Sequence, residues 1–440
     1  MSGSGELPVV LLDAIVLADD ALANVRIAGL SARERAVRVA KRVGADRVLV
    51  VESNAARANI TAWIEGNRNR ALLVVRADQL VHTPLCSRLV KALSAGEMPE
   101  RGVLRAVGAD GVDGGAYIAS ASRRADVAAA IAAGNDTTSF AEDAVSVEHG
   151  EIARHPISTP EERAGAHKLL YRILIKPQDN AITRYLYRPI SFPLTRMLVW
   201  TPITPNMISA IVACMVAVGC WFVMHASARD AVIGTVIIFA SAYFDCCDGE
   251  IARVKLLSSK LGAWIDTIVD EVSSTAYIVA LGIHCHREFG ATYWGFDNWI
   301  PIAGFAAVCC FVSMYCIYYE LIVVLGTANS QDYVGRFIAV PGASPNTVRL
   351  KPYEAGPKKP LPPLLQMVAT YAPYLARRDF LSWLTLILAL THLTQVSFML
   401  QAVGAIVMTL VLGLAHIRLL RLRRSIDRAG QIIEPPIPAA

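Results

Sequence analysis

Four aspartates stand close together in the stretch DCCDGEIARVKLLSSKLGAWIDTIVD, at the ends of two strongly apolar segments. Asp245 and Asp248 are one helical turn apart, as are Asp266 and Asp270, so in two helices each pair shares a face. If the helices run antiparallel, a rise of about 1.5 Å per residue puts both pairs at similar depth. The spacing therefore predicts four carboxylates converging on one place.

The chemistry of such a cluster is that of a hard divalent cation. Carboxylates packed together repel one another unless cations neutralise them. All-oxygen ligation suits Mg²⁺, Mn²⁺ or Ca²⁺ rather than Zn²⁺, and Mg²⁺ commonly combines a few carboxylates with substrate phosphates. Gly249, Ala252 and Gly262 leave backbone open to a ligand near the acids, and Arg253 offers a planar fork for phosphate oxygens. We therefore expect metal-assisted phosphate chemistry.

The full spacing, D-x2-D-G-x2-A-R-x8-G-x3-D-x3-D, is filled at every fixed position and resembles the signature of the CDP-alcohol phosphotransferase family. The resemblance implies that Asp245, Asp248 and Asp266 hold Mg²⁺ or Mn²⁺, with Asp270 close enough to contribute. It also implies that Asp270 deprotonates the acceptor hydroxyl and that the protein is a homodimer built through its membrane core. The implied nucleotide site comprises Gly249, Ala252, Arg253 and Gly262. In the alternative interpretation, the acids are interfacial caps and salt-bridge partners.

Hydropathy divides the chain into a soluble part and a membrane part. Hydrophobic residues make up 54% and mean hydropathy is +0.42, and the apolar excess falls almost wholly after residue 200. We predict an all-α membrane domain over 201–425, preceded by an amphipathic juxtamembrane segment at 166–200 and followed by a tail at 426–440. Its six expected spans are 206–224, 231–248, 261–284, 299–326, 380–393 and 398–416.

Positive charge sets the expected orientation of these spans. Lysine and arginine gather before the first span, between the second and third, between the fourth and fifth, and after the sixth. This asymmetry predicts cytoplasmic termini and a cytoplasmic carboxylate site in the cell inner membrane. The net charge of +5 is modest, and no basic block indicates a nucleic-acid partner.

The first 135 residues alternate apolar strands with amphipathic helices. Strands are expected at 9–17, 47–52 and 71–75, and helices at 31–43, 55–65 and 85–95. This order predicts an α/β domain with a doubly wound parallel sheet and helices on both faces. Ligands of such sheets bind beyond the carboxyl ends of the strands, here after Leu17 and Val75. Asp78, just past the third strand, is either a metal ligand there or an ordinary loop residue.

The order of elements looks like a sugar-nucleotidyltransferase domain, and family members fused to an inositol-phosphate cytidylyltransferase are known. That family carries a glycine-rich loop with a basic residue after the first strand, whereas this chain has LADDALANVRIAGLSARER. Asp19 and Asp20 would repel a triphosphate, so we expect a degenerate domain kept for scaffolding or regulation. The polar stretch 136–165 is expected to be a linker, with Ser158 or Thr159 capping a helix that begins near Pro160.

Further residues are candidates for substrate binding. Asn206 lies in TPNMIS, which resembles the start of the membrane core in this family; it either faces the nucleotide or caps the helix. An acceptor phosphate pocket would need cations, and a solvated cytoplasmic face explains the same cations equally well. The candidates are Lys255, Lys260, Arg188 and Arg336.

These features predict attack by an acceptor hydroxyl on the β-phosphate of a CDP-linked donor, with release of CMP. A cytoplasmic site at bilayer depth favours CDP-diacylglycerol as donor, and the fused domain suggests inositol phosphate as the polar alcohol acceptor. One alternative joins CDP-inositol to inositol phosphate. Another class, a cation- or proton-coupled transporter, would need acids spread through the bilayer, whereas these cluster on one side.

Overall fold

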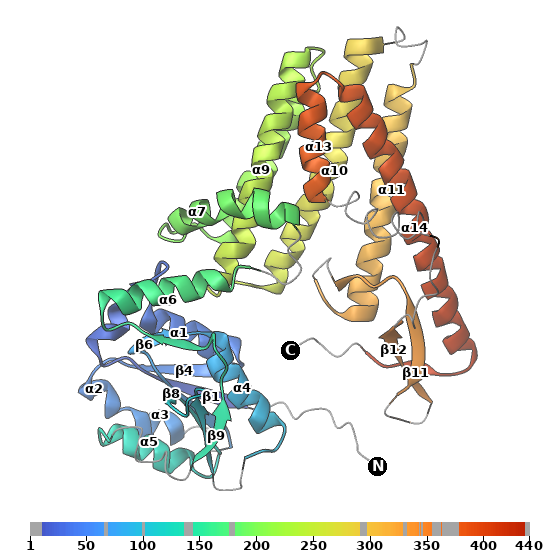
Figure 1. Cartoon of the computed structure of the whole chain (residues 1–440). Coiled ribbons are helices and arrows are strands. Elements are labelled where there is room, and N and C mark those ends of the chain that lie inside the picture. The colour runs from blue at the N-terminus through green and yellow to red at the C-terminus, as the bar shows by residue number, and fades with distance from the viewer. Residues whose placement is uncertain are drawn as a thin grey trace. The chain divides into compact units, whose positions relative to one another are not determined.

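The computed structural model describes residues 11–65, 69–98, 102–135, 144–175, 181–290, 297–328, 332–342, 344, 346–353, 362 and 378–435. The chain divides into two compact units, whose elements are labelled in Figure 1. The first unit comprises Met1–Gln178 with two short later segments, Arg196–Pro202 and Glu250–Leu257. The second comprises Asp179–Thr195, Ile203–Gly249 and Ser258–Ala440.

A six-stranded sheet forms the centre of the first unit. Its order is β4-β1-β5-β8-β7-β9. β1 pairs in parallel with β4 and β5, β9 pairs in parallel with β7, and β8 runs antiparallel to both β5 and β7. The strands are β1 (Leu12–Leu17), β4 (Ala45–Val51), β5 (Ala71–Arg76), β7 (Val103–Val107), β8 (Asp113–Ala119) and β9 (Ala144–Glu148).

Helices cover both faces of this sheet, as the sequence predicts. On one face, α1 (Ala32–Arg42) and α4 (Thr83–Ser94) bury apolar side chains against the sheet. On the other, α3 (Ile60–Glu65) and α5 (Arg124–Ala132) do the same. A capping box fixes the start of α1, because Ser31 and Glu34 satisfy each other's backbone N–H groups. Short elements complete the unit, namely η1 (Ala21–Asn24), β2 (Arg26–Ile27), β3 (Leu30–Ser31), α2 (Asn54–Arg57) and β6 (Gln79–Val81).

The sheet is mixed, so the expectation of an all-parallel sheet is wrong at β8. The connection from β7 to β8 turns at Gly111, which has a φ of +75°, and the N–H of Gly108 donates to the carbonyl of Val112 (2.9 Å). So tight a connection can join only antiparallel neighbours, because a parallel pair needs a crossover of a dozen residues or more.

The segment 136–165 is not a plain linker over its described residues. β9 is an edge strand of the main sheet, and β10 (Arg154–Pro156) pairs antiparallel with β6. Edge strands need no continuous apolar run, and β9 is half exposed, which explains why hydropathy misses it. The helix expected near Pro160 is confirmed as α6 (Pro160–Arg172), and Thr159 is its cap.

The second unit is mainly helical. Within the part of the chain that the structure describes, five helices are long and apolar enough to cross a membrane, judged by length and composition. They are α8 (Pro205–Val223), α9 (Ala228–Val254), α10 (Lys260–Phe289), α11 (Trp299–Glu320) with its π-helical extension Leu321–Leu325, and α14 (Thr394–Arg428). α10 packs against α8, α11 and α14. These helices support a membrane protein with five candidate spans.

The fifth of the six expected spans, 380–393, is not among the candidate spans. It forms α13 (Arg378–Leu390), a helix of 13 residues. At about 1.5 Å per residue this is roughly 20 Å, less than the roughly 30 Å hydrocarbon core of a bilayer. α13 ends before His392, which has a left-handed φ of +57°. The remaining elements are η3 (Thr183–Tyr187), α7 (Arg188–Leu198), and a small sheet of β11 (Phe337–Pro341), β12 (Thr347–Pro352) and β13 (Ile432–Ile433).

Candidate active site

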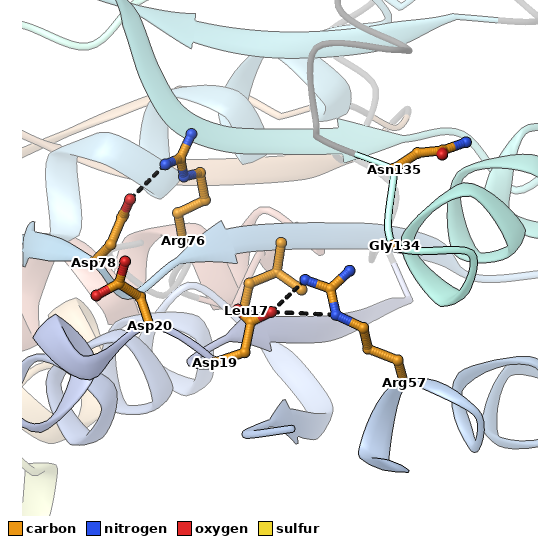
Figure 2. Close-up of a pocket in the computed structure, with 8 residues that line it drawn as sticks. All are labelled: Leu17, Asp19, Asp20, Arg57, Arg76, Asp78, Gly134 and Asn135. Atoms are coloured by element: carbon orange, nitrogen blue, oxygen red, sulfur yellow. Dashed lines mark hydrogen bonds and ion pairs between the residues drawn. The ribbon is translucent and has the colours of Figure 1, made fainter. Parts of the chain in front are cut away.

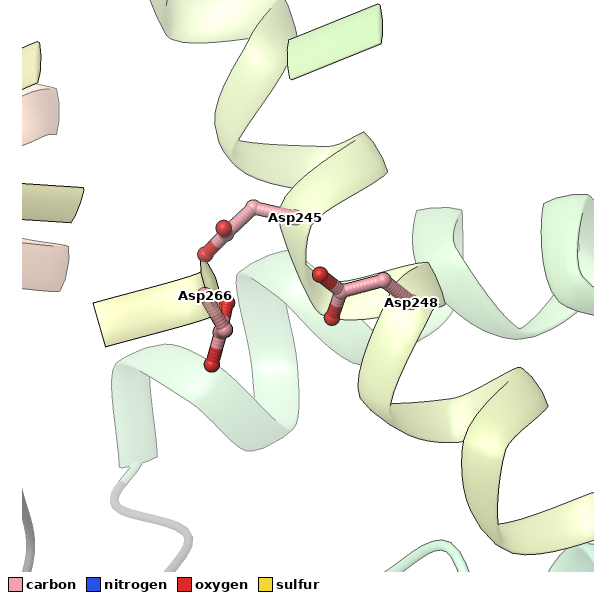
Figure 3. Close-up of side chains that lie close together, drawn as sticks. All are labelled: Asp245, Asp248 and Asp266. Carbon is pink, nitrogen blue, oxygen red and sulfur yellow. The ribbon is translucent and has the colours of Figure 1, made fainter. Parts of the chain in front are cut away.

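The second unit brings three of the four predicted acids together. Asp245 and Asp248 project from α9, Asp266 projects from α10, and their carboxylates point toward one another (Figure 3). One oxygen from each lies within 4.8 Å of the others. Asp270 is one turn further along α10, half-buried and outside this group of three. Its roles as a fourth ligand and as a base stay predictions.

A short connection between the two helices sets this meeting point. α9 ends at Val254, and α10 begins at Lys260 behind its cap Ser259, whose hydroxyl accepts from the N–H of Gly262 (2.9 Å). Asp245 is about 13 Å before the end of α9, and Asp266 is about 9 Å after the start of α10. The two levels are close enough for one turn of each helix to face the other.

A serine on a third helix holds the most buried of the three acids. Asp248 is only 6% exposed, and the hydroxyl of Ser209 on α8 donates to its Oδ2 (2.9 Å). Sequence reasoning missed Ser209, although it ends the TPNMIS segment. Its spacing of three residues from Asn206 puts both on one helix face, and that was the available signal.

The spacing of the three carboxylates fits a divalent metal. Mg²⁺ binds oxygen at about 2.1 Å, so its ligands lie at most about 4.2 Å apart, and small side-chain movements would bring these atoms into range. At the separation of up to 4.8 Å, each pair of unit charges repels by about 3 kcal/mol at an effective dielectric constant near 20. A cation shared by the three acids removes that cost.

Two of the predicted nucleotide-site residues approach each other beside the acids. A Cβ on Gly262 would lie 3.3 Å from Oδ1 of Asn206, so the glycine leaves room for this amide. Asn206 is exposed and is not the helix cap, because Thr204 has that role and accepts from the N–H of Met207 (3.4 Å). The alternative interpretation of Asn206 as a cap is therefore wrong.

The other nucleotide candidates follow the first two acids along α9. Gly249 is one turn beyond Asp245, and Ala252 is one turn beyond Asp248. Arg253 is half-buried in the last turn of the helix. Helical spacing therefore continues the face that carries the acids toward the end of α9.

The four acceptor candidates have different surroundings. Lys255 is 6% exposed, and its Nζ donates to the carbonyl of Thr201 (2.7 Å) within the first unit. Arg188 is 8% exposed, with its guanidinium carbon 5.3 Å from the ring centroid of Phe192. Arg336 is exposed and lies over the ring of Tyr353 (3.8 Å), while Lys260 is exposed at the start of α10. Their part in acceptor binding stays a prediction.

The first unit has a separate polar pocket where the sequence places a ligand site, beyond the carboxyl ends of β1 and β5 (Figure 2). Its volume is about 260 Å³. Polar side chains dominate its lining, which consists of Leu17, Asp19, Asp20, Arg57, Arg76, Asp78, Gly134 and Asn135.

The acids of this pocket have partners within the chain. Arg57 pairs with Asp19, and Arg76 pairs with Asp78. The carboxylate of Asp20 accepts from the N–H of Leu22 (2.7 Å), which caps η1. Arg57 therefore offsets the repulsion that Asp19 would exert on a phosphate.

Comparison with protein families agrees with the site. Residues 202–396, somewhat less than half of the chain, match the family model described as CDP-alcohol phosphatidyltransferase. The matched range contains α8, α9 and α10 and all four predicted acids.

Curated relatives that match the chain have a shared description, "Bifunctional IPC transferase and DIPP synthase". The protein from Aquifex aeolicus is 29% identical over 153 residues, which are 34% of this chain and 33% of that relative. The one from Thermococcus kodakarensis is 28% identical over 126 residues, 28% of each chain. The one from Rubrobacter xylanophilus is 24% identical over 135 residues, 31% of this chain and 30% of that relative. The aligned region thus spans about a third of these relatives.

Proposed function

We propose that the protein is an integral-membrane transferase that moves a phosphatidyl group from CDP-diacylglycerol to a hydroxyl of inositol phosphate and releases CMP. The observation that carries the proposal is the convergence of Asp245, Asp248 and Asp266 inside the range that matches the family model. A CDP-linked donor brings a pyrophosphate, and clustered carboxylates that hold divalent metal suit phosphate oxygens.

In this proposal Asp245, Asp248 and Asp266 hold Mg²⁺ or Mn²⁺. Bound metal would supply charge neutralisation for the donor pyrophosphate and for the departing CMP. The Ser209 hydroxyl keeps the Asp248 carboxylate turned toward the other two acids, because its hydrogen bond fixes one carboxylate oxygen.

The remaining residues bind substrates and move a proton. Asp270 takes the proton of the acceptor hydroxyl, since it lies one turn from Asp266 on the same helix face. Gly249, Gly262 and Ala252 leave space for the cytidine diphosphate, and Asn206 and Arg253 donate hydrogen bonds to it. Among the acceptor candidates, Arg188, Lys260 and Arg336 suit the acceptor phosphate better than Lys255, whose ammonium group donates to a backbone carbonyl.

The wider arrangement follows the predicted orientation. Both termini and the carboxylate site face the cytoplasm of the cell inner membrane, where water-soluble acceptor and lipid donor meet, and this orientation requires the segment of α13 to complete a sixth crossing beside the five candidate spans. The α/β domain does not catalyse cytidylyl transfer, and two copies of the chain form a dimer through the membrane helices. Each of these statements belongs to the proposal and can be tested on the purified chain.

The decisive experiment measures CMP release by the purified chain in detergent with Mg²⁺ and CDP-diacylglycerol. The acceptor panel contains inositol phosphate, inositol, glycerol phosphate and serine. Release that depends on inositol phosphate supports the proposal, and release with another acceptor corrects the substrate. Absence of release with every acceptor, in folded protein that binds CDP, would overturn CDP-diacylglycerol as donor.

A second candidate keeps the chemistry and changes the donor. The relatives' description names two activities, IPC transferase and DIPP synthase, and the order of elements in the α/β domain resembles a sugar-nucleotidyltransferase domain. These observations favour CDP-inositol as donor and inositol phosphate as acceptor. The same assay, with CDP-inositol replacing the lipid donor, separates the two candidates because the products differ in whether they partition into organic solvent.

A further inference from the structure

The last residues of α9 belong to the first unit, which contains the α/β sheet and is called the α/β unit below. Residues Glu250–Leu257 are part of the first unit, although the acids Asp245 and Asp248 on the same helix belong to the second. This last turn contains Ala252 and Arg253, two of the residues proposed to contact the nucleotide. Whatever fixes this turn also fixes those two side chains.

A left-handed leucine ends the helix. The N–H of Leu257 donates to the carbonyl of Ala252 (2.8 Å), and the N–H of Leu256 donates to that of Arg253 (3.4 Å). This is a Schellman motif, and its left-handed position is usually glycine. Here Leu256 adopts it with a φ of +55°. A leucine is uncommon in this conformation, so its side chain needs a compensating environment.

The α/β core provides that environment. Leu256 is 9% exposed and is a member of the core cluster that also contains Ala36 and Val39 of α1. On the same helix, Nη1 of Arg38 donates to the carbonyl oxygen of Lys255 (2.7 Å). The helix end is therefore held by a buried side chain and by a charged hydrogen-bond donor from α1.

The other short segment of the first unit, Arg196–Pro202, also contacts the end of α9. Lys255 donates through Nζ to the carbonyl of Thr201, and burial lowers the pKa of Lys255, with the charge of Arg38 adding to the effect. The segment Arg196–Pro202 approaches Gly29 so closely that a Cβ there would lie 1.9 Å from the carbonyl oxygen of Val199. Gly29 also has a φ of +78°, so only glycine suits this contact.

We propose that the α/β unit positions the nucleotide-binding turn of α9, with Arg38 and Leu256 as positioning residues. The inference rests on the proposed function and deepens it, because it gives the α/β unit a mechanical role at the CDP site. Neither residue touches substrate in this proposal. Both act through the backbone at Ala252 and Arg253.

The test uses three variants of the full chain in detergent. Arg38→Ala removes the donor to Lys255. Leu256→Gly removes the buried side chain and introduces the residue that favours the left-handed conformation, so the Schellman motif itself can still form. Arg33→Ala is the matched control, because it removes one positive charge from the same helix and breaks an ion pair with Glu52 (2.6 Å) instead of the hydrogen bond to Lys255.

Amide hydrogen exchange over 250–257 and CDP binding in the presence of Mn²⁺ are the two readouts. We expect Arg38→Ala and Leu256→Gly to speed exchange there and to weaken CDP binding, each by about tenfold, while Arg33→Ala changes neither. Mn²⁺ affinity without nucleotide should change less than about twofold, since the three acids lie in the other unit. Arg38→Lys, which keeps a donor, should restore most of the loss.

The outcomes separate the two proposals. Unchanged exchange or unchanged CDP affinity in both variants, beside normal binding by the unmodified chain, overturns the positioning role and leaves the proposed function standing. An unmodified chain that neither binds CDP nor turns over any CDP-linked donor overturns the proposed function and the positioning role with it. Equal losses of Mn²⁺ and CDP affinity would also overturn the positioning role, because they indicate general destabilisation.

Discussion

The negative charge of two aspartate clusters in this chain is compensated in different ways. In the pocket of the α/β unit, Asp19 and Asp78 each pair with an arginine from the same unit. At the α9–α10 site, three carboxylates face one another within 4.8 Å, and Asp248 accepts from the neutral hydroxyl of Ser209. The first arrangement neutralises its acids internally, and the second gathers oxygen ligands as a metal site does.

This difference shows why the number of acids alone does not identify a site. Both clusters lie where their fold places ligands, one at the carboxyl ends of parallel strands and one between facing helices. In the pocket, arginines pair with Asp19 and Asp78, and Asp20 accepts from a backbone N–H. The contrast predicts that substitutions of equal chemistry will have unequal effects in the two places.

Removing one acid of the α9–α10 site should have the largest effect. Asp266→Asn keeps the size of the side chain and removes one charged ligand, so we expect turnover to fall by roughly a thousandfold, within the range for the loss of a principal catalytic group. Mn²⁺ binding, measured by electron paramagnetic resonance on the detergent-solubilised chain, should weaken in parallel. Chelation of the metal with EDTA should abolish CMP release in the unmodified chain.

Asp270→Asn is the informative comparison for that variant. It should lower turnover by about 10²–10⁴-fold and leave Mn²⁺ binding within a few-fold, because a base is lost and the three converging acids remain. Ordinary activity in Asp270→Asn would remove this residue as the base. A loss of Mn²⁺ binding equal to that of Asp266→Asn would make it a principal ligand instead.

Ser209→Ala should have an intermediate effect. The substitution deletes the hydroxyl that donates to Asp248 (2.9 Å) and leaves all three carboxylates in place. Partners that orient metal ligands commonly contribute 10-fold to 100-fold in affinity or activity, so we expect Mn²⁺ affinity to fall by about tenfold. Ser209→Thr keeps a donor and serves as the matched control. Equal Mn²⁺ affinity in Ser209→Ala and the unmodified chain would show that Asp248 needs no such support.

Much of the site could be predicted from the sequence, because helical periodicity relates residues near one another in the chain. The two acid pairs and the short connection after Val254 were enough to predict the meeting of Asp245, Asp248 and Asp266. Ser209 was missed because its helix is separated from the motif by a full span, and periodicity does not relate separate helices. Lys255 shows the converse: its charge indicated a substrate phosphate, and only the structure shows it buried against Thr201.

The fold was predicted less evenly, for physical reasons that differ between the units. In the α/β unit, β1, β4 and β5 have continuous apolar runs and were predicted, whereas the buried strands β7 and β8 and the exposed edge strand β9 were not. The direction of β8 depends on the turn at Gly111 and not on hydropathy. In the helical unit, apolar length predicted the long helices well, whereas the expected span 380–393 had only 14 residues and forms α13, a helix too short to cross a bilayer upright.

Substitution of the pocket acids should have the smallest effect on CMP release. This expectation directly tests the difference between the two aspartate clusters. The double variant Asp19→Asn with Asp78→Asn breaks the ion pairs to Arg57 and Arg76, which are partly exposed and each contribute less than about 1 kcal/mol to the free energy of unfolding. CMP release should stay within about twofold of the unmodified chain, since these side chains do not belong to the α9–α10 site. The unfolding midpoint of the detergent-solubilised chain should fall slightly, because two arginines that line the pocket then lose their carboxylate partners. A fall in CMP release approaching that of Asp266→Asn, at an unchanged unfolding midpoint, would show that the pocket takes part in catalysis.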